Sequence, residues 1–249
     1  MTSKPRVLAT TVPIHKSTLS SQEAQRIGVS VKNSPAGDIF FVGPKELDWS
    51  YYKLNWPEVR IEVFEDRHFQ SVQSYSDWML TPGLYERFKH YEFLLICQTD
   101  AILVEPLDPT CWDFDYLGSV WDPPLDASWD PIRKTLIQIS FGLSSRRLVV
   151  GNGGLSIRKV DAFLAFVDRI PVLKKKKNED LVISYFAEKY KLRCATPKIA
   201  EVTFMEGAAK NWEPGKMVPK VKGFHGLERF NPELEKLILS QVLNHPIFP

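Results

Sequence analysis

A carboxylate interrupts an apolar stretch in the first half of the chain. Phe93–Cys97 is apolar throughout, Gln98, Thr99 and Asp100 follow directly, and a second apolar run begins at Ala101. A carboxylate beside a buried strand is costly unless it is paired, hydrated or bound to a metal. Asp100 either ligates a hard cation such as Mg²⁺ or Mn²⁺, which bridges carboxylates to phosphates, or closes a strand-end turn through backbone N–H groups. The residues alone leave both interpretations open.

Three glycines in four residues form the second motif, Gly151–Gly154. Glycine allows positive φ and lets backbone approach a ligand closely. Asn152, between the glycines, can donate to and accept from a polar ligand such as a sugar. A tight strand-to-helix turn without a ligand is the alternative, and a glycine turn alone does not decide between them.

Two acids stand at the start of a predicted helix, in the sequence Asn178-Glu179-Asp180. Asn178 is a favourable N-cap, and acids in a first turn suit the helix dipole, which explains them without function. A carboxylate that faces a cleft could instead act as general base and accept the proton of an attacking hydroxyl.

His225 lies between glycines near the C-terminus, in GFHG. We expect an accessible loop there, and imidazole is a good ligand for Mn²⁺-type metals. An inert surface histidine is the alternative. Lys220 and Lys222 nearby could meet phosphate charge or simply be solvated.

Strands and helices are predicted to alternate around these motifs. Strands are expected at residues 6–14, 39–42, 59–64, 92–106 and 115–121. One helix is expected after Ser20, which forms a capping-box signature with Glu23, and another after Thr81, with Pro82 at its first position. Such alternation predicts an α/β fold with a mostly parallel sheet and helices on both faces. Ligands bind such sheets at the carboxyl ends of strands, where Asp100 is expected.

The second half is less regular. Residues 123–135, rich in Pro, Trp and Asp, are predicted to form a long loop of the kind that often binds or covers a ligand. Residues 149–167 are predicted as a strand, a glycine turn and a helix. Helices are also predicted at residues 178–190 and 231–243.

Length and composition exclude several classes of protein. The 249 residues suit one large domain or two small ones, and we favour one. With 44% hydrophobic residues, no apolar stretch approaches the roughly 18 needed to cross a bilayer. The N-terminus is too polar and too rich in proline for a secretory signal. A net charge of +2 does not indicate a nucleic-acid partner.

Cysteine and lysine usage adds two expectations. Three widely spaced cysteines predict a reducing, cytoplasmic setting without disulfides or a cysteine metal site. The run Lys174–Lys177 is either a solvated face or a contact with phosphate or anionic lipid, which would place the protein peripherally at a membrane.

Seven segments, taken in order, resemble a bacterial family described as a domain of unknown function. That family belongs to the GT-A glycosyltransferase superfamily and looks linked to surface-polysaccharide gene clusters. The resemblance runs from about Val7 to Phe230. The segments are VPIHKSTLS, FEDRHFQSVQSYSDWML, LYERFKHYEFLLICQTDAILV, DYLGSVW, GNGGLSIRKV, NEDLVISYF and GFHG.

The resemblance implies a single GT-A-like domain over residues 1–249, with a Rossmann-like sheet. Residues 1 to about 105 would bind a nucleotide-sugar and residues 106–249 an acceptor. In the superfamily an Asp-x-Asp motif holds a divalent metal, here Mn²⁺ or Mg²⁺, against the donor diphosphate. Gln98-Thr99-Asp100 takes that place, with an amide instead of the first acid. His225 matches a C-terminal histidine that completes the metal shell in related transferases.

The same resemblance implies further roles. Glu179 and Asp180 match the acidic pair that supplies the base in many inverting members. Trp121 and the GNGG residues would contact sugar or acceptor. Trp129 and Trp212 could also offer flat apolar faces to sugar rings, although core and loop packing explains the seven tryptophans more simply. Donor-binding roles are implied for Thr11, Pro13, Ile14, Asp66, Arg67, Tyr75, Asp100 and Lys222, and sugar or acceptor roles for Trp121, Gly151, Asn152, Gly153 and Gly154.

The implied function is transfer of a hexose from a nucleoside-diphosphate sugar, expected to be a uridine diphosphate sugar. The acceptor would be a hydroxyl of a glycan or lipid-linked glycan in surface-polysaccharide synthesis, at the cytoplasmic face of the inner membrane. One alternative is a non-catalytic glycan- or nucleotide-sugar-binding module, because Gln98 stands where an acid is expected. Another is a sugar nucleotidyltransferase, which generally has a glycine-rich phosphate loop after its first strand, and VPIHKSTLSS contains no glycine.

Overall fold

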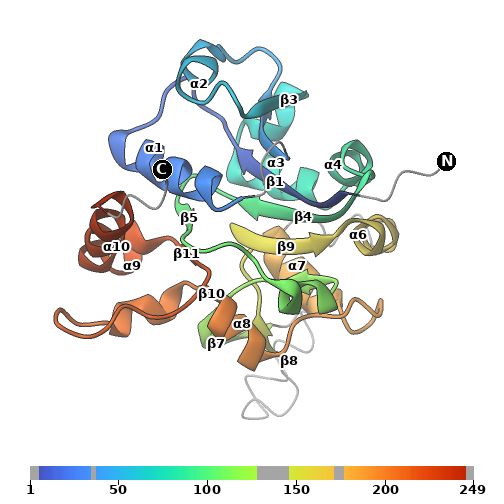
Figure 1. Ribbon diagram of the computed structural model, residues 1–249. Coiled ribbons are helices and arrows are strands. Elements are labelled where there is room, and N and C mark those ends of the chain that lie inside the picture. Colours follow the sequence, from blue (N-terminus) through green and yellow to red (C-terminus); the bar gives the residue numbers. More distant parts are fainter. Residues whose placement is uncertain (1–5, 35–37, 128–145, 171–176, 245–249) are drawn as a thin grey trace.

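Strands and helices alternate in the N-terminal half, as the sequence predicts. The computed structural model describes residues 6–34, 38–127, 146–170 and 177–244. Within these ranges six strands form the central sheet, in the order β3-β2-β1-β4-β9-β6 (Figure 1). The first four run parallel, and β9 runs antiparallel to both of its neighbours. The strands are β1 (Arg6–Pro13), β2 (Ile39–Pro44), β3 (Arg60–Phe64), β4 (Tyr91–Cys97), β6 (Tyr116–Leu117) and β9 (Leu155–Lys159).

Helices cover both faces of this sheet, because side chains alternate along each strand. Leu94 and Ile96 of β4 point to one face, where they pack with α3, α4, α6 and α7. Phe93 and Leu95 point to the opposite face, on which α1 and α2 cover β1 and β2. The predicted α/β architecture is confirmed. The helices are α1 (Ser21–Lys32), α2 (Ser50–Asn55), α3 (Val72–Met79), α4 (Pro82–Arg87), α6 (Val160–Val167) and α7 (Glu179–Phe186).

A second, three-stranded sheet lies beyond the carboxyl end of β4. The strand predicted over residues 92–106 is therefore two strands, because β4 ends at Cys97 and the backbone turns before the next strand starts at Ala101. In this turn the N–H of Ala101 donates to the carbonyl of Gln98. The central strand of the second sheet, β11, pairs antiparallel with β5 and parallel with β10. These strands are β5 (Ala101–Leu103), β10 (Phe204–Met205) and β11 (Gly223–His225).

Two predictions for the second half are corrected. Residues 120–127 form strand β7 (Val120–Ala127), paired with β8 (Arg146–Val150), so the predicted loop begins with a strand. Residues 128–145, with Trp129, lie outside the described residues. The glycine turn leads into strand β9, and the predicted helix follows only from Val160. The remaining elements are η1 (Asp66–Phe69), η2 (Pro109–Asp113), α8 (Pro197–Thr203), η4 (Gly207–Asn211), α9 (Leu227–Phe230) and α10 (Pro232–Asn244).

The helix ends follow local chemistry in part. The capping box of α1 is confirmed, because the Ser20 hydroxyl accepts from the N–H of Glu23 and the Glu23 carboxylate accepts from the N–H of Ser20. Pro82 is the first residue of α4, but the Thr81 hydroxyl donates to the carbonyl of Trp78 instead of capping the helix. Asn178 makes no side-chain capping bond to α7.

The structure gives the environment of the three cysteines and the length of the helices, both of which the composition raised. Cys97 and Cys111 are buried and Cys194 is half-buried, and none of the three is in a disulfide. Across the described ranges, no helix combines the length and apolar character needed to cross a bilayer. Of the lysine run 174–177, only Lys177 belongs to the described residues.

Candidate active site

Asp100 lies in the turn that links the two sheets, and its backbone is held from two sides. The carbonyl of Asp100 accepts from the N–H of Gly226, 2.9 Å away. The carbonyl of the preceding Thr99 accepts from Nε of Arg26, a buried side chain of α1, at 2.9 Å. These bonds satisfy backbone groups that a turn otherwise leaves to water. The Asp100 carboxylate therefore projects from a fixed backbone at the carboxyl end of β4.

His225 faces Asp100 because of strand pairing. In the antiparallel register of β11 with β5, His225 lies opposite Ala101. Its Nε2 lies 3.1 Å from Asp100 Oδ1, within ion-pair distance. The geometry is not that of a hydrogen bond, so Nε2 is a buried nitrogen without a hydrogen-bond partner among the described residues. The charge of Asp100 compensates this nitrogen when the ring is protonated, and a bound ligand can do so when it is not.

The other ring nitrogen of His225 has two neighbours. Nδ1 lies 2.9 Å from Glu206 Oε1 and also 2.9 Å from Asn152 Nδ2. A protonated Nδ1 donates to Glu206, whereas a bare Nδ1 accepts from Asn152, so one tautomer cannot satisfy both contacts. Burial alone would lower the pKa of His225, but Asp100 and Glu206 outweigh it and raise the pKa to about 9. For Asp100, burial raises the pKa, yet His225 and Arg229 bring it below its usual value.

Asn152 is held in an unusual backbone conformation, with φ of 66°. Asparagine tolerates this left-handed region better than most residues. Its Oδ1 accepts from the N–H of Gly154 at 2.9 Å, and its Nδ2 donates to Ser119 Oγ at 3.1 Å. These two bonds fix the amide so that its NH₂ group faces His225.

Close packing explains the glycines around Asn152. A Cβ atom on Gly154 would lie 2.1 Å from His225 Nε2, and one on Gly153 would lie 1.8 Å from Glu179 Oε1. A Cβ atom on Gly151 would lie 2.0 Å from the Trp121 ring. No side chain fits at these distances, so glycine is required for other site residues to approach the turn.

The two acids of the NED motif differ in environment. Glu179 is 5% exposed; it accepts from Ser76 Oγ at 3.0 Å and lies 3.4 Å from Nη2 of the buried Arg158. Asp180 accepts from the N–H of Leu181 at 2.7 Å. Burial, followed by the charge of Glu179, raises the pKa of Asp180 to about 6. Glu179 is therefore a structural partner of Arg158, and Asp180 is a carboxylate that can exchange a proton near neutral pH.

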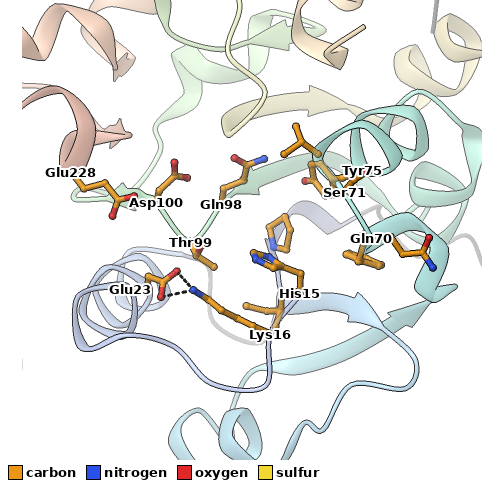
Figure 2. Close-up of a pocket in the computed structure, with 14 residues that line it drawn as sticks. His15, Lys16, Glu23, Gln70, Ser71, Tyr75, Gln98, Thr99, Asp100 and Glu228 are labelled. Atoms are coloured by element: carbon orange, nitrogen blue, oxygen red, sulfur yellow. Dashed lines mark hydrogen bonds and ion pairs between the residues drawn. The ribbon is translucent and has the colours of Figure 1, made fainter. Parts of the chain in front are cut away.

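A cavity of about 590 Å³ opens beside Asp100, between the ends of β1 and β4 and the segment before α3 (Figure 2). Four residues with predicted site roles line it: Pro13, Ile14, Tyr75 and Asp100. Gln98 and Thr99, which precede Asp100 in the predicted metal motif, line it as well. The remaining lining residues, which had no predicted donor-binding role, are His15, Lys16, Glu23, Phe69, Gln70, Ser71, Val72 and Glu228.

Four residues predicted to bind the donor do not line this cavity. The hydroxyl of buried Thr11 donates to the carbonyl of Leu95 within the sheet. Asp66 accepts from the N–H of Glu46. Arg67, with a side chain 70% exposed, pairs with Glu65, and Lys222 pairs with Glu105 and Asp108. Of the predicted tryptophans, Trp121 packs over Gly151, and Trp212 donates through Nε1 to the carbonyl of Met217.

Residues 58–209 match the sequence model of a family described as "Protein of unknown function (DUF5672)". The chain belongs to the DUF5672 family. The match begins before β3, and it includes Asp100, the GNGG turn, both acids of the NED motif and Glu206. His225 lies beyond it. Among curated proteins no match is found for this DUF5672 chain.

Solved structures show the fold of this DUF5672 member. The apo structure of the WbbM bifunctional glycosyltransferase superposes with a TM-score of 0.56 at 12% identity, covering 99% of this chain and 51% of that one. The chain thus spans about half the length of that structure. A putative glucose-1-phosphate thymidylyltransferase from Bacillus anthracis, in complex with a sucrose, gives a TM-score of 0.47 at 12% identity, with 76% and 86% coverage. The fold is GT-A-like.

The DUF5672 site also contains two charged residues that sequence reasoning missed. Glu206 follows β10 and contacts His225, as described above. Arg229, on α9, places Nη2 3.5 Å from Asp100 Oδ2 and 3.8 Å from Glu206 Oε1, with its side chain 56% exposed. Gly226 makes room for it, because a Cβ atom there would lie 2.6 Å from Arg229 Nη2. The sequence signal for Arg229 is its position four residues after His225. No sequence signal points to Glu206.

Proposed function

We propose that this chain is a glycosyltransferase that moves a hexose from a nucleoside-diphosphate sugar to a hydroxyl of a glycan. The observation that carries the proposal is the convergence of Asp100, His225 and Asn152 beside a cavity at the carboxyl ends of the central strands. This is where parallel α/β sheets bind ligands. The likeness in fold to a structure named as a glycosyltransferase supports the same class.

The donor nucleotide would occupy the cavity. Pro13, Ile14, Phe69, Val72 and Tyr75 supply apolar and aromatic surface, and the other nine lining residues are polar or charged. A pocket that combines apolar surface with polar groups suits a ligand with both a ring system and charged groups. Uridine diphosphate is the carrier we propose, with its diphosphate next to Asp100.

A divalent cation, Mn²⁺ or Mg²⁺, fits the pair formed by Asp100 and His225. The buried Nε2 without a hydrogen-bond partner faces Oδ1 at 3.1 Å, near the roughly 3 Å that separates neighbouring octahedral ligands with bonds of about 2.1 Å. Among the described residues, no three histidine, cysteine or acidic side chains form a complete metal cage. Phosphate oxygens and water would therefore complete the shell. When bound, the cation supplies Lewis-acid stabilisation of charge on the diphosphate.

Arg229 would contribute a permanent positive charge to the same end of the donor. Its guanidinium is exposed and reaches Asp100 only at 3.5 Å, so it can turn toward a phosphate without losing a short bond. Arginine offers paired N–H donors that match phosphate oxygens. We propose that Arg229 binds the diphosphate as it leaves the sugar.

Asp180 is the proposed general base. It accepts the proton of the acceptor hydroxyl as that oxygen bonds to the anomeric carbon of the sugar. The bond from that carbon to the diphosphate breaks, and the nucleoside diphosphate leaves with the bonding electrons. A base with a pKa of about 6 is mostly ionised at neutral pH yet basic enough to take the proton.

The proposal also includes an acceptor and a cellular setting, both named only by class. A glycan or lipid-linked glycan, in bacterial surface-polysaccharide synthesis, would approach across the GNGG turn, with Asn152 on the transferred sugar and Trp121 on the acceptor side. Residues 1–105 would then carry the donor and residues 106–249 the acceptor within one domain. A peripheral position at the cytoplasmic face of the inner membrane agrees with a lipid-linked acceptor.

Turnover of a panel of nucleoside-diphosphate sugars, with Mn²⁺ and with chelator, tests the proposal. The panel is run for wild type and for Asp100→Ala, His225→Ala and Asp180→Asn. Asp161→Asn is the matched control, because Asp161 also lies in the first turn of an eight-residue helix but is exposed. Turnover that falls in the three site variants and not in the control is expected. Binding without turnover of any donor would instead identify a binding module.

A further inference from the structure

We propose that Glu206 is a positioning residue that holds His225 with its Nδ1 protonated, so that Nε2 presents its lone pair to a divalent cation. The inference rests on the metal site within the proposed function. It concerns a residue outside the motifs, and it follows from three contacts around one imidazole ring.

Strand pairing places Glu206 beside His225. In the parallel register of β10 with β11, Met205 pairs with Phe224, so the residues that follow them, Glu206 and His225, are neighbours. Glu206 Oε1 lies 2.9 Å from Nδ1, and its side chain is 15% exposed. A histidine that ligates a metal commonly donates its other N–H to a carboxylate, which sets the tautomer and the ring orientation.

Asn152 competes with Glu206 for the same nitrogen. Its amide is oriented by Gly154 and Ser119, so Nδ2 can only donate toward Nδ1 at 2.9 Å. Donation from Asn152 requires a bare Nδ1, and the proton of a neutral ring is then on Nε2, where it blocks a cation. A bond to a carboxylate is roughly twice as strong as one between neutral groups. Glu206 therefore favours the metal-binding tautomer over the other.

Asp100 acts on the other nitrogen. Nε2 lies 3.1 Å from Asp100 Oδ1, within ion-pair distance, so without a cation this carboxylate favours a second proton on Nε2. A cation bound by Asp100 and His225 would displace that proton, while Glu206 keeps the proton on Nδ1. Once Nδ1 donates to Glu206, the Asn152 amide is left without an acceptor at His225. It is then available to a hydroxyl of the donor sugar.

Titration of the purified protein with Mn²⁺, followed by the electron paramagnetic resonance of the free ion, tests the inference without any donor sugar. Glu206→Ala should weaken Mn²⁺ binding about 10- to 100-fold, the usual cost of removing such a partner. Glu206→Gln should lose less, because its amide oxygen still accepts from Nδ1. Glu201→Gln, an exposed acid of α8, is the matched control and should bind as wild type does.

The tautomer is read separately, by long-range ¹H–¹⁵N correlation spectra of protein labelled at its five histidines and loaded with Mg²⁺. Wild type and Glu206→Gln should show His225 with the proton on Nδ1, and Glu206→Ala should lose that preference. Asn152→Gly, which tolerates the positive φ, should keep it. A purely structural role for Glu206 would leave the tautomer unchanged.

Unchanged Mn²⁺ affinity in both Glu206 variants would overturn the inference, and the Gln variant decides if the Ala variant does not fold. Wild type without Mn²⁺ affinity would overturn it too, and would leave His225 as an imidazolium between two carboxylates. Donor turnover that persists in chelator, with no Mn²⁺ binding, would remove this inference and leave the proposed function standing. Mn²⁺ binding that depends on Glu206, without turnover of any donor, would support this inference and overturn the proposed function.

Discussion

His225 Nε2 lies 3.1 Å from Asp100 Oδ1 because β11 pairs antiparallel with β5 and sets His225 opposite Ala101. His225 is the last residue of β11, and Asp100 lies in the short turn before β5, where its carbonyl accepts from the N–H of Gly226. Backbone hydrogen bonds therefore hold both residues in place. A site held in this way keeps its geometry better than one on free loops. The glycine turn lies against the imidazole, so it limits where the ring can go.

Gly154→Ala should disrupt the site through packing alone. The new methyl group would lie 2.1 Å from His225 Nε2, so the ring must move, at a cost of about 1–3 kcal/mol in the free energy of unfolding. Donor turnover should fall as well. Gly28→Ala is the matched control, because no atom lies within 4 Å of its Cβ position within α1, and it should stabilise by about 0.5–1 kcal/mol. Urea unfolding and a turnover assay measure both effects, and equal behaviour of the two variants would contradict the packing described.

Asp180 should set the acid limb of the pH profile. As the base it must be ionised, so kcat is expected to rise with pH through a midpoint of about 6, the raised pKa of this carboxyl. Asp180→Asn should remove both the activity and this limb, whereas Asp161→Asn should keep them. A midpoint near the ordinary value of an aspartate, about 4, would assign the limb to another group.

The same raised pKa predicts that Asp180 costs stability at neutral pH. A carboxyl whose folded pKa lies above its unfolded value stabilises the fold at low pH, and this contribution is lost as pH rises through the folded pKa. From the ordinary value of 3.8 to about 6, the shift corresponds to at most about 3 kcal/mol. Asp180→Asn should therefore raise the free energy of unfolding at pH 8 more than at pH 4. The opposite trend in chemical denaturation would contradict the burial of this carboxyl.

Glu179→Gln should destabilise the fold, whatever its effect on transfer. Arg158 is fully buried, and Glu179 lies 3.4 Å from it, so the substitution leaves a buried cation without its carboxylate, at a cost of about 3 kcal/mol or more. Urea unfolding measures this cost. If the variant is as stable as wild type but inactive, Glu179 and not Asp180 would be the base.

Arg229→Ala should weaken binding of uridine diphosphate about tenfold, since loss of one charge-assisted contact is worth about 1.4 kcal/mol. Binding of uridine, which has no phosphate, should not change. Calorimetry with the two ligands separates these effects. Arg87→Ala is the control, because Arg87 is also an exposed arginine that pairs with a half-buried acid, Glu62, but it does not line the cavity. Equal losses for both ligands would place Arg229 elsewhere in the pocket.

Local chemistry made part of the fold predictable from sequence. The Ser20–Glu23 capping box, the strand expected at residues 6–14 and the start of the strand expected at residues 92–106 depend on neighbours in the chain, and the structure contains them. The polar residues Gln98–Asp100 interrupt the apolar run in the sequence, but the sequence did not show that a strand ends there. An apolar run does not show whether its two halves pair in one sheet or in two.

The candidate site was predictable only as separate motifs. Asp100, Asn152 and His225 each have a chemical type that suits a site, and the structure brings them together. Glu206 shows no pattern, because its role depends on the register of β10 with β11. Arg67 and Lys222 were expected at the donor, but both pair with exposed acids instead. A single sequence does not show which of several charged residues a fold turns inward.

A crystal structure of the protein soaked with a uridine diphosphate sugar and Mn²⁺ tests the central claim most directly. The predicted result is a diphosphate beside Asp100, His225 and Arg229, with the nucleoside in the cavity lined by Ile14 and Tyr75 and the anomeric carbon open to Asp180. Electron density for the nucleotide at another place, or an empty cavity at saturating donor, would contradict the proposed transferase site.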